Sequence, residues 1–177
     1  MPPTCLLASS PVAGNGAPRV ATIGVYGFSA ETFLAALAKA GVVRVLDVRQ
    51  RRGVRGRQYA WANSRRLQAL LAAAALGYRH LPALAPTTEL RELQYRADER
   101  AGVGKRSREA LAPEYVARYT REILDSAELG SVLALLPAAG LAALLCVERD
   151  PAACHRSLVA AALAAEHGAM VIDIVPA

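Results

Sequence analysis

The chain is poor in aromatic residues, in cysteine and in long apolar runs, and each shortage excludes a class of protein. Aromatic residues make up 5% of the 177 residues, although 54% are hydrophobic. No apolar run reaches the roughly 18 residues that a membrane-spanning helix needs. Three cysteines are too few for a disulfide framework, so we expect a cytoplasmic protein with no membrane partner. A helix-rich globular protein remains, because the apolar content argues against disorder.

The length fits a single domain with an ordinary core. Residues 1–18 are rich in proline, glycine, serine and asparagine, and we expect them to form a flexible N-terminal tail. This tail has no Lys or Arg before its short apolar patch at residues 5–8, so it does not fit a secretory signal. Residues 19–177 then form the domain.

Short segments typical of strands, most of them apolar, alternate along the chain with helical patterns. We expect strands over residues 19–24, 42–48, 78–81, 141–145 and 170–175. We expect helices over residues 29–40, 63–74 and 129–136, and a charged helical insertion over residues 87–125. Asp150 is expected to cap the last long helix, with Pro151 at its first position. The alternation predicts a single three-layer α/β domain, with a mainly parallel sheet of about five strands flanked by helices.

Reactive side chains are concentrated near the C-terminus. Two of the three cysteines and one of the three histidines lie within ten consecutive residues, 146–155. An apolar run precedes this stretch and an alanine-rich run follows it, which is typical of a turn from a strand to a helix. The carboxyl ends of parallel strands meet at one edge of the sheet, where ligands bind. Asp47 and Arg49 leave another expected strand at this edge and are expected to lie near Cys146 and Glu148.

The two thiols, Cys146 and Cys154, can be reactive or structural. A cysteine close to a helix N-terminus and to Arg or protonated His has a lowered pKa, and Cys154 is expected one turn into the last helix, beside His155. The alternative is that both thiols are packed in the core as small hydrophobic groups. A phosphatase-like Cys-x5-Arg loop is absent, because positions 152 and 160 are alanine, and so is a Cys-x-x-Cys pair.

A zinc site is disfavoured by the same spacing. Adjacent cysteine and histidine side chains on one helix point about 100° apart, so Cys154 and His155 are not expected to share an ion. Paired Cys-x2-Cys spacing is also absent. We therefore expect no metal and no cofactor.

Charged side chains at the same edge suit acid–base chemistry and anion binding. Asp47 and Glu148 can act as a general base or orient neighbouring guanidinium groups. Arg49 and Arg156 can clamp a phosphate or carboxylate through paired hydrogen bonds. The alternative is an ion-pair network that ties the loops to the sheet.

The basic character of the chain belongs to one segment. Eight arginines lie between Arg44 and Arg66 against a single acid, Asp47, which gives this segment a net charge of +7 in a chain of +6. So local a charge implies an anionic partner. Tyr59 and Trp61 alternate there with basic residues, a pattern typical of nucleic-acid binding. The alternative is a solvated cationic loop that Trp61 anchors to the core.

Four segments together resemble the bacterial and archaeal family called domain of unknown function 488. They are Thr22-Ile23-Gly24, Asp47-Val48-Arg49 with its arginine-rich loop, Tyr78 to Pro82, and Cys146-Val147-Glu148 through Cys154 to Ser157. The resemblance covers most of the chain from Arg19 onward and implies an α/β fold with a shared polar site. The family usually has His-Ser after the first Thr-Ile-Gly, where this chain has Val25-Tyr26.

The sequence predicts an anion-binding, enzymatic pocket at the C-terminal edge of the strands, acting on a nucleotide, a nucleic acid or another phosphate-bearing substrate. The expected catalytic residues are Cys146, Glu148, Cys154, His155 and Asp47. The residues expected to bind substrate are Arg49, Arg52, Arg55, Tyr59, Trp61 and Arg156. One alternative is a non-catalytic nucleic-acid-binding module that uses residues 49–61. Another is a structural or regulatory protein whose motif only locks the fold. The sequence predicts no oligomeric state.

Overall fold

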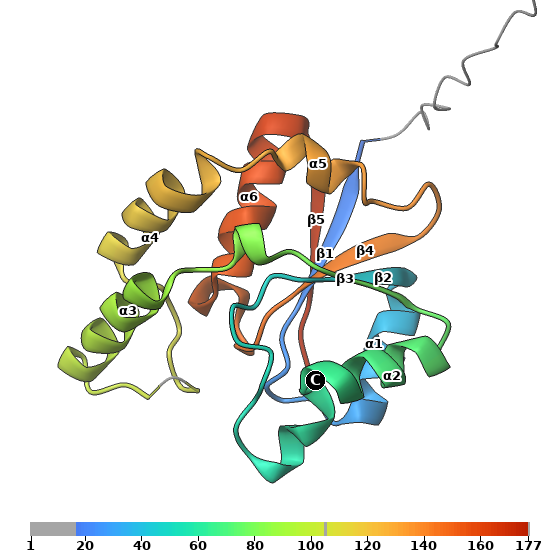
Figure 1. Cartoon of the computed structure of the whole chain (residues 1–177), viewed down its shortest axis with the longest axis horizontal. Helices are drawn as coiled ribbons and strands as arrows, with labels where there is room; N and C mark the ends of the chain where they lie inside the picture. The colour runs from blue at the N-terminus through green and yellow to red at the C-terminus, as the bar shows by residue number, and fades with distance from the viewer. Residues whose placement is uncertain (1–16, 105, 177) are drawn as a thin grey trace, which may run out of the picture.

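The computed structural model describes residues 17–104 and 106–176, so the expected tail lies outside the described residues except for its last two. Figure 1 shows strands alternating with helices along the domain. The elements are β1 (Arg19–Ile23), α1 (Ala30–Lys39), β2 (Val42–Asp47), η1 (Arg57–Ala62), α2 (Ser64–Ala73), β3 (Gly77–His80), η2 (Pro82–Leu84), α3 (Thr88–Arg100), α4 (Pro113–Tyr119), η3 (Thr120–Leu124), α5 (Leu129–Leu133), β4 (Leu141–Leu145), η4 (Pro151–Ala153), α6 (His155–His167) and β5 (Met170–Ile174).

The described strands form one parallel sheet in the order β3-β2-β4-β1-β5. β4 lies at its centre, and all five of its residues are buried. A continuous apolar run of this kind is typical of a parallel strand covered on both faces. The sheet and its helices confirm a single α/β fold class.

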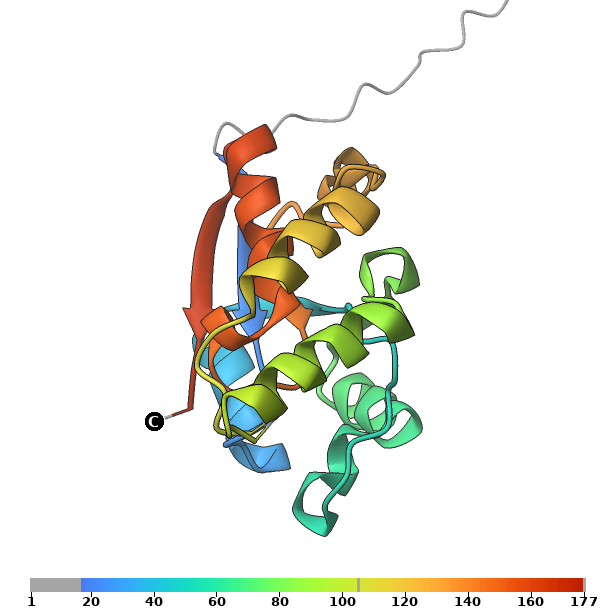
Figure 2. The same ribbon diagram turned by 90° about the vertical axis from the view of Figure 1, so that its left-hand side faces the viewer.

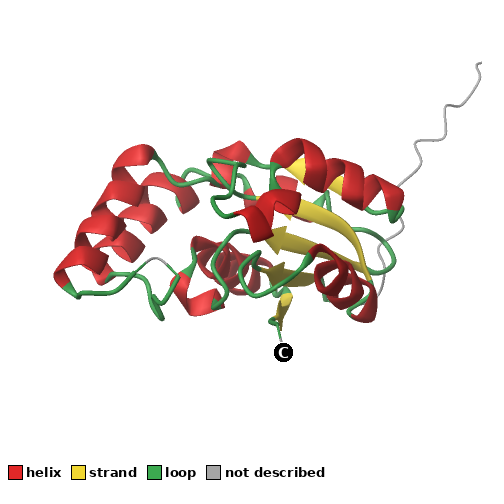
Figure 3. Cartoon of the chain, turned by 90° about the horizontal axis from the view of Figure 1, so that it is seen from below, coloured by secondary structure: helices red, strands yellow, loops and turns green. Residues whose placement is uncertain are grey.

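Helices cover both faces of the sheet (Figure 3). The chain runs from β1 to β2 to β3 toward one edge, and from β4 to β5 toward the other. Right-handed crossovers therefore place α1 and α2 on one face and α6 on the opposite face. β4 lies between β2 and β1 in the sheet. The helix that follows β4 lies on the opposite face from the helices that follow β1 and β2. The carboxyl end of β4 is thus a topological switch point, where α/β sheets bind ligands.

The expected helical insertion consists of α3 and α4, which pack together and against the α6 side of the molecule (Figures 1 and 2). α4 continues directly into η3, a π-helical turn. The two helices extend past the end of the sheet at which the strands finish. They therefore form one side of the switch-point region.

The element boundaries follow the expected caps with two exceptions. The Ser29 hydroxyl accepts a hydrogen bond from Thr32 N and begins α1, as expected. Asp150 was expected to cap the last long helix, and this prediction is wrong: its carboxylate accepts from Ala152 N and caps the short η4 turn. α6 begins only at His155, with Cys154 as its N-cap. The second exception is α5, which ends at Leu133 rather than at residue 136. Within the described ranges, no helix is long and apolar enough to cross a membrane.

Candidate functional site

A cavity of about 350 Å³ opens at the carboxyl end of β4. Its lining comes from the loop after β2, from α3 and α4, and from the β4–α6 turn. Six expected site residues line it: Arg49, Arg55, Cys146, Glu148, Cys154 and His155. Five others do not: Asp47, Arg52, Tyr59, Trp61 and Arg156. The structure therefore brings together the two thiols, the imidazole and the Glu148 carboxylate.

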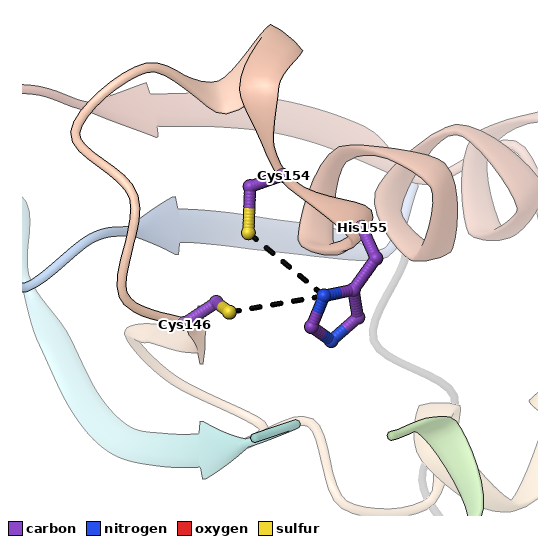
Figure 4. Close-up of side chains that lie close together, drawn as sticks. All are labelled: Cys146, Cys154 and His155. Carbon is purple, nitrogen blue, oxygen red and sulfur yellow. Dashed lines mark hydrogen bonds between the residues drawn. The ribbon is translucent and has the colours of Figure 1, made fainter. Parts of the chain in front are cut away.

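Two sulfur atoms face one imidazole nitrogen at the base of this cavity (Figure 4). His155 Nδ1 lies 3.8 Å from Cys146 Sγ and 4.0 Å from Cys154 Sγ. The other ring nitrogen, Nε2, lies 3.0 Å from the carbonyl oxygen of Val48. Because a carbonyl can only accept, Nε2 carries a proton and Nδ1 is the nitrogen available to the sulfurs. All three side chains are buried.

Local backbone geometry produces this convergence. Cys146 directly follows β4, and its N–H donates to Ile23 O. Asp150 and Pro151 then form the η4 turn, after which Cys154 is extended, with φ −141° and ψ 139°. An extended residue projects its side chain differently from a helical one, so the expected divergence of Cys154 and His155 does not occur. The prediction that these two side chains diverge is wrong, because Cys154 lies before the helix rather than inside it.

The thiols differ in their acidity. Burial raises the pKa of Cys146 well above its ordinary value, and the neighbouring Cys154 and Glu148 raise it further. Burial also acts to raise the pKa of Cys154, but a hydrogen bond from Cys146 and the positive charges of Arg156 and His155 hold it well below the ordinary value. Burial lowers the pKa of His155, whereas the hydrogen bond and charge of Cys154 raise it more, so the net shift is upward. The cluster favours negative charge on sulfur beside the imidazole.

Arg108 donates a hydrogen bond to Glu148 and fixes its carboxylate, a contact that was not predicted from the sequence. Its Nη2 donates to Glu148 Oε1 at 3.1 Å, its Nη1 donates to Asp98 Oδ2 at 2.7 Å, and Ala153 O accepts from its Nε and Nη2. The side chain is 6% exposed. A signal for this contact was present, because Gln94 and Asp98 follow Leu90 at intervals of four. These three residues lie on one face of α3, and this face is buried. Its two polar side chains therefore predict a polar partner inside the protein.

Asp47 and Arg49 form a buried ion pair, of which only Arg49 lines the cavity. Arg49 Nε and Nη2 donate to the two carboxylate oxygens at 2.8 and 2.7 Å, and its Nη1 donates to Ala62 O. The Tyr78 hydroxyl also donates to Asp47 at 2.8 Å. Burial lowers the pKa of Arg49, but the Asp47 carboxylate raises it more. These contacts favour the ion-pair network among the roles considered for Asp47.

Arg156 is fully buried and donates to three protein oxygens rather than facing the cavity. Its partners are Thr22 Oγ1, Glu148 O and Arg149 O, and the shortest contact is 2.7 Å, to Glu148 O. Gly24 packs against the same carbonyl, which leaves no space for a Cβ atom there. Arg156 therefore fixes the backbone of the β4–α6 turn, a placement that favours the structural alternative over an anion clamp.

The aromatic residues of the arginine-rich loop face the core. The Trp61 ring lies 4.9 Å from that of Phe33, and the Tyr59 ring lies 5.0 Å from that of Tyr26. Arg106, from the insertion, lies over both tyrosine rings. This packing favours the alternative in which Trp61 anchors the loop. Arg52 donates to the Tyr78 hydroxyl and lines a separate shallow surface with Arg65 and Arg66.

Other cavity residues were also not foreseen. They are Tyr26, Gln50, Arg51, Arg91, Tyr95 and Tyr115, among others. Arg91 donates to Gln50 Oε1 and to the Tyr95 hydroxyl, each at 2.8 Å, and so joins α3 to the loop after β2. Tyr115, expected only to pack, stacks on Tyr119, and burial raises its pKa strongly. Tyr26 occupies a position at which the resemblance leads one to expect serine.

Comparison with known proteins identifies one family. A family model described as "Domain of unknown function DUF488" matches residues 29–163, which include Asp47, Arg49, Cys146, Glu148 and His155. Comparisons with curated proteins and with solved structures give no match. The matched segment spans most of the sheet, the insertion and the β4–α6 turn, and the chain belongs to the DUF488 family.

Proposed function

We propose that the protein is an enzyme that acts on a phosphate-bearing substrate, a nucleotide or a nucleic acid, in the cavity at the end of β4. The observation that carries the proposal is the composition of this cavity: Cys146, Cys154 and His155 form its buried part, and arginines from separate segments line the rest. A volume of about 350 Å³ lies within the range of small-molecule sites. The free thiols fit the reducing cytoplasm that the sequence predicts.

Charge supports a phosphate-bearing substrate. The described lining contains five arginines, at positions 49, 51, 55, 91 and 108, and one acidic residue, Glu148. Arg49 and Arg108 are bound to buried carboxylates, but Arg51 and Arg55 are exposed at the mouth. Guanidinium groups recognise phosphate oxygens through paired, charge-assisted hydrogen bonds.

Nucleotide titration tests this proposal. We expect ATP or ADP to bind the wild-type protein in a calorimeter, and the Arg51→Ala/Arg55→Ala variant to bind at least about tenfold more weakly, because each lost contact to a charged group is worth about 1.5 kcal/mol or more. The matched control, Arg57→Ala/Arg79→Ala, removes the same charge at exposed positions outside the cavity. Equal weakening in both variants, or no nucleotide binding by the wild type, would contradict the proposal.

The non-catalytic alternative has one observation in its favour. Arg52, Arg65 and Arg66 line a shallow surface beside the cavity and could bind a nucleic-acid backbone without the thiol cluster. In that case a single-stranded oligonucleotide would bind with an affinity that falls steeply with salt. His155→Gln would leave this affinity unchanged, and nucleotides would not bind at the cavity.

A further inference from the structure

We infer that Cys146, Cys154 and His155 bind a zinc ion. The two Sγ atoms and His155 Nδ1 all lie within 4.8 Å of one another. Ligands of one tetrahedral zinc ion, with Zn–S near 2.3 Å and Zn–N near 2.0–2.1 Å, place sulfur and nitrogen about 3.6 Å apart. The observed sulfur–nitrogen distances are 3.8 and 4.0 Å. The three atoms thus surround a point that one ion can occupy after small side-chain movements.

Hydrogen bonding alone does not explain this arrangement. Both sulfur–nitrogen distances are long for a hydrogen bond, and the Nδ1 lone pair, opposite the protonated Nε2, can accept a hydrogen from only one of the two thiols. A catalytic cysteine–histidine pair needs a single thiol facing the ring. Here the nitrogen points between two thiols (Figure 4). A metal ion satisfies all three atoms at once.

The imidazole is oriented as metal-binding histidines usually are. Its Nε2 lies 3.0 Å from Val48 O, at the end of β2. Donation from the second nitrogen to a backbone carbonyl fixes both the ring position and the tautomer, and leaves the lone pair of Nδ1 free for the metal.

The ligand set selects zinc. Thiolate and imidazole ligands in tetrahedral geometry suit Zn²⁺, whereas magnesium and calcium require oxygen ligands. The ligands are also held rigidly: Cys146 N donates to β1, and Cys154 N donates to Pro151 O in the η4 turn. A buried site built from fixed backbone positions needs little rearrangement to bind its ion.

The fourth coordination position faces the cavity. Three protein ligands with one open position characterise catalytic zinc sites, whereas structural sites have four protein ligands. All three ligand residues line the cavity, and Glu148 Oε2 lies 3.4 Å from Cys146 Sγ. Glu148 is not part of the three-residue ligand group, so its carboxylate stands beside the ion.

This geometry points to hydrolysis, a role that rests on the proposed function. A zinc ion held by Cys146, Cys154 and His155 would lower the pKa of a bound water to near 7, and Glu148 would accept the proton that the water loses. The hydroxide would then form a bond to the electrophilic atom of the substrate while the bond to the leaving group breaks, and the leaving group would take the proton from Glu148. Water is the co-reactant, and no electron is transferred.

Metal titration of the full chain tests the site directly. Chelator-treated protein, kept reduced with a phosphine, is titrated with Zn²⁺ and, separately, with Co²⁺. We expect one Zn²⁺ per chain and a Co²⁺ spectrum with thiolate charge-transfer bands and intense tetrahedral visible bands. Absence of stoichiometric zinc binding at micromolar concentration, or a Co²⁺ spectrum without thiolate bands, would overturn the inference. Both readouts use the wild type, so they do not depend on the folding of a variant.

Variants with matched controls locate the ion. Cys146→Ser, Cys154→Ser and His155→Gln should each weaken zinc binding by at least about 100-fold, because each removes a direct ligand. Cys5→Ser and His167→Gln repeat the same chemical changes elsewhere and should keep one zinc per chain. Glu148→Gln should also keep its zinc, and loss of zinc in that variant would refute the open fourth position.

The two proposals fail separately. Zinc is titrated without any phosphate compound, and nucleotides are titrated against both zinc-loaded and zinc-free protein. Zinc binding without nucleotide binding would support the metal site and contradict the proposed substrate. Nucleotide binding without zinc binding would support the proposed substrate and contradict the metal site.

Discussion

Arg156 has a different role in the structure from the one that its position in the sequence suggests. Its position next to His155 suggested a guanidinium facing an anion, yet it donates to Thr22 Oγ1 and to the carbonyls of Glu148 and Arg149. Sequence spacing reports which residues are close along the chain but not which way a helix-borne side chain points. On α6, residues 155 and 156 point in different directions, one into the cavity lining and the other toward β1.

Replacing Arg156 should therefore affect stability first. We expect Arg156→Met to lower the free energy of unfolding by about 3 kcal/mol or more, because three hydrogen bonds to a charged group are lost and their acceptors stay buried. Denaturant unfolding measures this change, and Arg66→Met, at an exposed site, should change stability by less than about 0.5 kcal/mol. An Arg156→Met variant of unchanged stability that no longer binds nucleotides would instead restore the anion-clamp role.

Among the elements, the five strands and the first helix were predictable, because their apolar runs and caps are local signals. Ser29 and Gly41 bracket α1 in the sequence and in the structure. The start of α6 was not predictable in this way. Asp150-Pro151 is a good helix start, but tertiary contacts end that turn after Ala153 and leave Cys154 extended. That difference decides whether Cys154 and His155 can share an ion.

The insertion was recognised as helical, but its connection to the site was not. Arg108 joins α3 to the β4–α6 turn through Asp98 and Glu148, contacts between residues 10 and 40 positions apart in the chain. The spacing of Gln94 and Asp98 on α3 indicates a buried polar face, but nothing in the sequence indicates which arginine pairs with it. The arginine is almost completely buried, so these carboxylates offset the cost of removing its charge from water.

A double-mutant cycle measures this connection between elements. Arg108→Met should destabilise the protein by about 3–5 kcal/mol, since it removes the guanidinium that forms ion pairs with two buried carboxylates. Asp98→Asn should destabilise it less, and the double variant should be more stable than the sum of the single effects predicts, with a coupling of about 0.5–3 kcal/mol. Additive effects in denaturant unfolding would show that α3 is not held by this pair.

For the whole molecule, the strand order and the metal site lead to a joint expectation about stability. β1 contacts Cys146, β2 ends next to the carbonyl that orients His155, and the proposed ligands lie directly after β4 and at the start of α6. An ion at this point would join the central strands to α6, and the unfolded chain would lose that arrangement. Zinc should therefore stabilise the entire fold rather than one loop.

Thermal unfolding with and without zinc checks that expectation. At a free zinc concentration of a thousand times Kd, binding to the native state alone adds about 4 kcal/mol. For a domain of this size each kcal/mol raises Tm by about 2–4 °C, so Tm should rise by roughly 10 °C. His167→Gln should show the same rise, whereas His155→Gln should show little change, because Nδ1 no longer completes the site. Equal rises of Tm in both variants would place the stabilising ion elsewhere on the protein. If zinc does not raise the Tm of the wild type, then zinc does not stabilise the fold through this cluster.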